Sequence, residues 1–129
     1  MREIKFRAWL KEDRKMEDVK TMDFTDKTIR CLKKNEFINA YLLRRVSFDD
    51  VELMQYTGLN DKNGKEIYER DVVKLVHFKD GRKIETGKVI FLHSQAGFGI
   101  IDKDGNEYPL FRNTAKQIEI IENIQENKR

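Results

Sequence analysis

The 129-residue chain has little of the chemistry that stabilises or anchors secreted and membrane proteins. Cys31 is its only cysteine, so no disulfide can form within the chain, and a reducing cytoplasm is the expected compartment. The segment MREIKFRAWLKED contains no apolar run of the length that a signal peptide or a membrane anchor needs. We therefore expect a cytoplasmic protein with no membrane partner.

Proline and glycine are also scarce, at one and seven residues, and no Gly/Ser-rich run suggests a flexible linker. Charge, in contrast, is abundant, because 38% of the residues are charged. Lys and Arg number 26 and Asp and Glu 23, which leaves a net charge of +3. This mild excess is not the strongly basic composition of a dedicated nucleic-acid binder, although a local basic patch is compatible with it.

Residues from which active sites are commonly built are few. His77 and His93 are the only histidines, and together with Cys31 they could supply at most part of a metal site. No serine or cysteine stands in a pattern that activates a nucleophile. We therefore expect no catalytic residues, no metal site and no cofactor.

Two loops imitate ligand-binding motifs. The segment at 58–66, GLNDKNGKE, has one residue too many between its glycines for a phosphate loop, and Asn63-Gly64 instead predicts a tight hairpin turn. Asp102, Asp104 and Asn106 alternate like the first ligands of a calcium loop, but the rest of that pattern is missing, which favours a second turn.

The first predicted strand, residues 4–10, carries the one candidate binding face. Its alternation places Lys5, Arg7 and Trp9 on one face, with Lys11 following, and the apolar residues Ile4, Phe6, Ala8 and Leu10 on the other. An aromatic side chain among bases is typical of a stacking platform for single-stranded nucleic acid. The alternative is that Trp9 packs against another part of the protein while the bases are solvated.

The rest of the N-terminal region, 1–57, predicts an antiparallel β-meander with a short helix. Alternating pieces at 19–24 and 28–32 indicate strands, and 51–57 has the composition of another. Apolar residues in 36–45 are spaced as on a helix, with Asn35 as its N-cap.

The region 58–129 predicts a small β-barrel. Strands are expected at 72–78 and 88–92, with apolar residues on both parities, and FGIID and EYPLF are joined across the turn KDGN. The segment QIEIIENI fits both helical and strand spacing, and we favour a closing strand. Short strands separated by tight turns favour a barrel because closure leaves few exposed edges.

Three segments, FRAWLKEDRKM, VELMQYTGLNDKNGKEIYERDVV and IEIIENIQEN, resemble the YopX family of phage and prophage proteins in order and spacing. The resemblance implies a phage or prophage origin and an SH3-like fold for the predicted C-terminal barrel. It transfers no catalytic or binding residue. Arg70 and Glu122 stand where the family usually has Gly, and Arg70 would be strained if that position requires a positive φ.

These observations predict a mainly β (α+β) protein: an N-terminal meander with a short helix, and an SH3-like β-barrel. The leading functional hypothesis is a non-enzymatic phage accessory protein in the bacterial cytoplasm, acting as a protein-interaction module. Its partner would be a phage or host protein, or a second copy of itself. The alternatives are a weak nucleic-acid binder that uses Lys5, Arg7, Trp9 and Lys11, and, ranked last, an enzyme whose site is assembled from residues distant in sequence.

Overall fold

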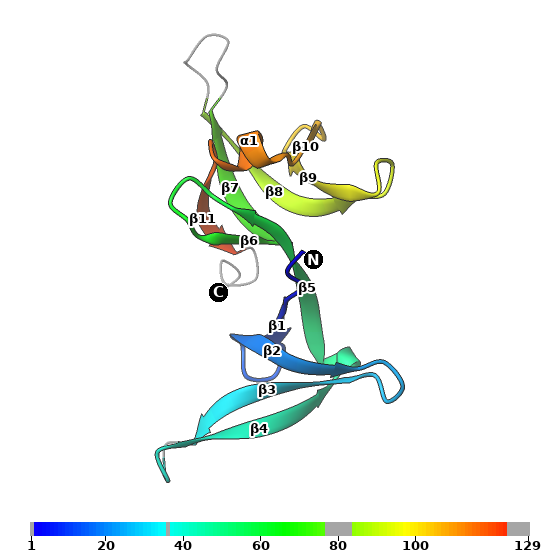
Figure 1. The fold of residues 1–129 in the computed structure, drawn as a ribbon, viewed down its shortest axis with the longest axis vertical. Coiled ribbons are helices and arrows are strands. Elements are labelled where there is room, and N and C mark those ends of the chain that lie inside the picture. The colour runs from blue at the N-terminus through cyan, green and yellow to red at the C-terminus, as the bar shows by residue number, and fades with distance from the viewer. Residues whose placement is uncertain (1, 36, 77–83, 124–129) are drawn as a thin grey trace. The chain divides into compact units, whose positions relative to one another are not determined.

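The computed structural model describes residues 2–35, 37–76 and 84–123, and strands dominate these ranges (Figure 1). The strands form two antiparallel sheets, one in the order β4-β3-β2-β1-β5-β6 and one in the order β10-β9-β8-β7-β11. The chain divides into two units, one spanning Lys5–Gln55 and the other comprising the residues before Lys5 and those from Tyr56 onward. The sequence-based boundary after Thr57 lies two residues from this division.

The N-terminal unit is an antiparallel meander, as predicted. It consists of β1 (Phe6–Leu10), β2 (Lys15–Asp23), β3 (Thr28–Asn35), β4 (Ala40–Ser47), a single-turn 3-10 helix η1 (Phe48–Asp50) and the first half of β5 (Val51–Asn60). β1 lies between β2 and β5, and β4 forms the edge of the sheet. Strands that follow one another in sequence are thus mostly neighbours in space, which keeps the connections short.

Alternation along the strands determines the core of this unit. Ala8 and Leu10 of β1 are 0% and 3% exposed, as the apolar face predicted for the first strand requires. They cluster with Ile29, Cys31, Val46 and Val51. Ile4, assigned to the same face, precedes β1 and is 57% exposed, so the buried part of that face begins only within the strand.

The helix predicted at 36–45 is wrong, because most of this segment belongs to β4. β4 pairs with β3 along its full length, from Asn35↔Ala40 to Thr28↔Ser47. Asn35 does act as a cap, but of a turn: its side-chain oxygen accepts hydrogen bonds from the backbone N–H groups of Phe37 (2.9 Å) and Ile38 (3.4 Å). The turn reverses the chain, and pairing with β3 overrides the helical spacing.

The C-terminal unit contains the second half of β5 and the remaining elements. These are β6 (Glu66–Tyr68), β7 (Asp71–Val76), β8 (Ile84–Leu92), β9 (Gly97–Asp102), β10 (Glu107–Pro109), α1 (Arg112–Ala115) and β11 (Glu119–Asn123). The hairpin across KDGN and the strand favoured for QIEIIENI are both confirmed. Of the strand predicted at 72–78, residues 77 and 78 lie outside the described residues.

A second hydrophobic core lies in this unit. It consists of Ile67, Val73, Leu75, Val89, Ile100, Leu110, Ala115, Ile118 and Ile120. Val72 and Lys74, between the buried residues of β7, are half-buried. The mainly β class is confirmed, and among the described strands the five-stranded sheet is open, without pairing between β10 and β11.

Buried aspartates organise two turns of the unit. Asp61, 5% exposed, accepts the backbone N–H groups of Asn63 and Lys65, both at 2.9 Å, and thereby shapes the reversal predicted at Asn63-Gly64. Asp102, 7% exposed, accepts those of Asp104 and Asn106 at the same distance. Both segments are therefore turns held by a carboxylate, as the sequence favoured, and not ligand loops.

Candidate protein-interaction surface

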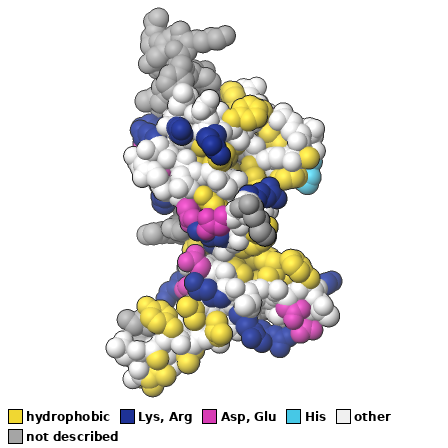
Figure 2. Space-filling model, viewed as in Figure 1, with side chains coloured by type: hydrophobic (Ala, Val, Ile, Leu, Met, Phe, Trp, Pro, Cys, Tyr) yellow, Lys and Arg dark blue, Asp and Glu magenta, His cyan; other side chains and the backbone are white. Residues whose placement is uncertain are grey.

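Five large apolar side chains are exposed together at the end of the β3–β4 hairpin. We call Phe37, Ile38, Tyr41, Leu42 and Leu43 the hairpin surface. Their exposed fractions are 99%, 62%, 66%, 49% and 57% in that order. Figure 2 shows hydrophobic side chains gathered over this end of the hairpin. Contiguous apolar patches on a protein surface are typical of sites that contact other macromolecules.

The hairpin extends beyond the core of its unit. Near its base, Val46 pairs with Ile29, and both side chains are buried. Further along, Leu42 pairs with Lys33 and Leu43 with Leu32. Because neighbouring residues of a strand point to opposite faces, the apolar side chains of β4 line both faces of an edge strand.

A hollow of about 720 Å³ adjoins the hairpin surface. It is lined by Lys15, Lys33, Asn35, Phe37, Leu42, Leu43, Arg44 and Arg45. The carboxylate of Asp13 forms ion pairs with Arg44 and with Lys33 (3.4 Å). Partial burial raises the pKa of Asp13, but hydrogen bonding and the charges of Arg44 and Lys33 outweigh it, so the pKa lies below its ordinary value. The carboxylate of Asp13 therefore neutralises part of the positive charge of the lysine and arginine side chains that line the hollow.

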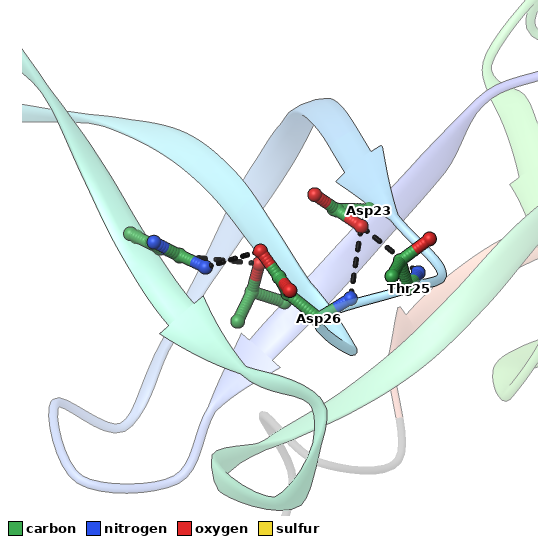
Figure 3. Close-up of polar contacts among 5 residues, drawn as sticks. Asp23, Thr25 and Asp26 are labelled. Carbon is green, nitrogen blue, oxygen red and sulfur yellow. Dashed lines mark hydrogen bonds and ion pairs between the residues drawn. The ribbon is translucent and has the colours of Figure 1, made fainter.

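The turn between β2 and β3 supplies the carboxylate for Arg45 (Figure 3). Asp23 accepts the backbone N–H groups of Thr25 and Asp26, both at 2.9 Å, and the Asp26 N–H is the main reason why the pKa of Asp23 is lowered. Asp26 in turn forms an ion pair with Arg45 (2.8 Å), whose Nε also donates to Thr28 Oγ1 (3.3 Å). Both arginines of β4 thus pair with carboxylates of their own chain.

The residues predicted to bind nucleic acid lie partly together. Lys5, Arg7 and Trp9 are half-buried at and before β1, and the two strand residues share a face. Arg7 Nε donates to the sulfur of Met54 (3.4 Å). Lys11 is in the following turn, where its ammonium group donates to the backbone oxygen of Asp49 (3.1 Å). Binding of nucleic acid by this face stays a prediction.

Candidate catalytic and metal-ligating groups are dispersed. Among the described residues, no three His, Cys, Asp or Glu side chains gather closely enough to hold a metal ion. Cys31 is buried, and burial followed by the negative charge of Glu17 raises its pKa, which disfavours the thiolate. His93 is exposed with its ring edge-on to Phe91, and His77 lies outside the described residues.

Sequence reasoning missed the hairpin surface, although a signal was present. Tyr41, Leu42 and Leu43 are three consecutive large apolar residues that follow Ala40 and precede the charged Arg44 and Arg45. Such a run suits neither one face of a helix nor one face of a strand. Read as a strand, it would have indicated an edge with apolar side chains on both sides.

Two antiparallel sheets with very little helix define the chain as a mainly β protein. Sequence comparison then identifies its family. The family model described as YopX protein matches residues 5–129, so the chain belongs to the YopX family. The chain is similar in fold to the crystal structure of protein EF1440 from Enterococcus faecalis, with a TM-score of 0.65 and 21% identity, covering 98% of this chain and 96% of that one. No curated protein sequence matches it. Within the described ranges, no helix is long and apolar enough to cross a membrane.

Proposed function

We propose that the protein is a phage or prophage accessory protein that acts in the bacterial cytoplasm as a non-enzymatic protein-interaction module. The hairpin surface is the proposed contact face. The observation that carries this proposal is the exposure of five neighbouring apolar side chains on and beside an edge strand. An edge strand offers backbone hydrogen bonds to an added strand, and apolar side chains on both faces supply the affinity.

The proposal includes an SH3-like barrel in the C-terminal unit as the rigid part of the module. Membership of the family and the antiparallel meander β7–β8–β9–β10 support it. A closed barrel protects the amides of its outer strands against hydrogen exchange. Rapid exchange of every amide on the outer edges of β10 and β11 would argue for an open sheet instead.

The interaction is tested by capture from lysates of phage-infected bacteria on three immobilised proteins. These are the wild type, the double variant Phe37→Ser/Leu43→Ser, and the control Phe111→Ser, which removes a 65% exposed aromatic residue from the other unit. We expect the wild type and the control to retain the same partner, and the double variant to lose it by more than about tenfold, because two apolar contacts disappear. Equal retention by all three, or a wild type that stays monomeric and retains no protein, would refute the proposal.

Nucleic-acid binding through Trp9 is the second candidate, favoured by the half-exposed basic and aromatic residues on one face of β1. Titration of labelled single-stranded DNA at two salt concentrations tests it, since phosphate contacts produce a salt-dependent affinity. Trp9→Ala is expected to weaken binding by about 1–3 kcal/mol, whereas Trp9→Phe retains a stacking ring. Identical affinities of the wild type and Trp9→Ala would remove this candidate.

A further inference from the structure

The arginines of β4 restrict the kind of partner that the hairpin surface suits. Arg44 is paired with Asp13 and Arg45 with Asp26, so the edge strand carries its own counter-ions. An acidic peptide would have to displace these carboxylates before it gained an ion pair. A partner strand that is apolar, and whose charges are already paired, neither competes with these carboxylates nor repels the arginines. A second copy of this strand has that composition.

β4 is also complementary to itself in one register. Two antiparallel copies of a strand in one sheet are related by a two-fold axis, so that one residue faces its own copy. With Leu43 at the axis, Tyr41 faces Arg45 of the second copy and Leu42 faces Arg44. Each of these pairs joins an apolar or aromatic side chain to a long cationic one, and the Tyr–Arg pair allows a cation–π contact.

The neighbouring registers would pair the two strands less favourably. An axis at Arg44 or at Arg45 would place two guanidinium groups directly opposite each other, which destabilises a strand pair. An axis at Leu42 avoids this repulsion but shifts the overlap toward Ala40, the first residue of β4. Leu43 lies closest to the middle of Ala40–Ser47 among the positions without like charges, and thus pairs the longest stretch.

We propose that β4 pairs with β4 of a second copy, antiparallel and centred on Leu43, so that the six-stranded sheets of two molecules join into one. This inference rests on the proposed function, because it names the partner of the hairpin surface. Tyr41 and Leu43, 66% and 57% exposed in the single chain, gain cross-strand contacts with side chains of the second copy on one face of the joined sheet.

Cysteine cross-linking tests the register. In the proposed pairing the Cβ atoms of Leu43 and its copy are about 4.5–5.5 Å apart, so Leu43→Cys is expected to form a covalent dimer under mild oxidation. Tyr41→Cys is the matched control on the same face. Its two thiols would be four residues apart along the strand, about 13 Å, and should not cross-link. Buried Cys31 is present in all samples, so the oxidised wild type serves as the background.

The mass of the wild type, measured by light scattering over a wide range of protein concentration, tests the association itself. A dimer that Leu43→Lys dissociates and Leu43→Cys traps supports the inference. A dimer in which Tyr41→Cys cross-links and Leu43→Cys does not would overturn the register. A wild type that is monomeric yet captures another protein through the hairpin surface overturns the inference and leaves the proposed function standing.

Discussion

The carboxylate of Asp61 accepts a hydrogen bond from the backbone N–H of Ile120 (3.0 Å), which lies 59 residues further along the chain. Its other oxygen accepts the N–H groups of Asn63 and Lys65. The backbone N–H of Lys62 also donates to the carbonyl oxygen of Ile118 (3.0 Å). One buried side chain therefore shapes the β5–β6 turn and joins it to β11.

Asp61→Ala is expected to lower the free energy of unfolding by about 3 kcal/mol. Hydrogen bonds to a charged group contribute about 1.5–3 kcal/mol, and the buried N–H of Ile120 would lose its acceptor. Asp104→Ala is the control, because its side chain is exposed and only its backbone N–H takes part in a turn. Urea unfolding followed by circular dichroism measures both variants. Equal losses would show that Asp61 has no special role.

Acid should destabilise the protein in part through Asp61. Burial raises the pKa of this carboxyl, but the N–H groups of Ile120, Lys65 and Asn63 lower it more, so the folded pKa lies below the ordinary 3.8. The unfolded chain then binds more protons in acid. The stability that Asp61 contributes is thus complete above the unfolded pKa and is lost as the pH falls through the folded pKa.

This pH dependence is measured as the free energy of unfolding of the wild type and of Asp61→Asn across the acid range. We expect the wild type to be more stable at neutral pH and the difference to shrink below about pH 4, where the unfolded carboxyl begins to bind protons. A difference that is constant with pH would contradict the proposed protonation linkage.

Arg70→Gly is expected to stabilise the protein. Arg70 has a φ of 69°, so the sequence-based suspicion of strain at this position is confirmed. Left-handed backbone costs a non-glycine residue about 1–2 kcal/mol, from which the greater freedom of glycine in the unfolded chain subtracts about 0.4–1. Arg70→Ala is the comparison, since it removes the same side chain and keeps the strain. Gly should therefore exceed Ala in thermal stability.

Gly99→Ala is expected to destabilise the C-terminal unit by about 1–3 kcal/mol. A Cβ at position 99 would lie 2.8 Å from the carbonyl oxygen of Tyr108 and would clash with the side chain of Leu92. Gly97→Ala is the matched control in β9, because its nearest atom would be 3.8 Å away. Thermal unfolding should separate the two variants, and equal melting temperatures would mean that the backbone shifts to accept the methyl group.

The turns were predictable because their constraints are local. Gly64 and Gly105 have φ angles of 82° and 84°, and the residues before them can accept backbone N–H groups within the same few positions. The strand β11 was predictable for a related reason, since Ile118 and Ile120 alternate. Their burial at 1% and 9% exposure shows that period two, and not the competing helical spacing, describes this segment.

β4 and the hairpin surface were not predictable in the same way. The spacing of Phe37, Ile38, Tyr41 and Leu42 fits a helix, and only pairing with β3, a tertiary interaction, decides against it. Exposure is harder still to predict, because it depends on where the core ends. Val46 is buried while Leu42, on the same face of the same strand, is 49% exposed.

Because Cys31 is buried, the reactivity of its thiol reports on the opening of the N-terminal unit. Its thiol is 0% exposed and its raised pKa keeps it in the unreactive form, so a thiol reagent should react only when the N-terminal unit opens. Because the sequence has no second cysteine, the labelling rate of the wild type reports on this unit alone. The rate at which Cys31 is labelled therefore measures how often the meander opens, and the measurement needs no substitution in the chain.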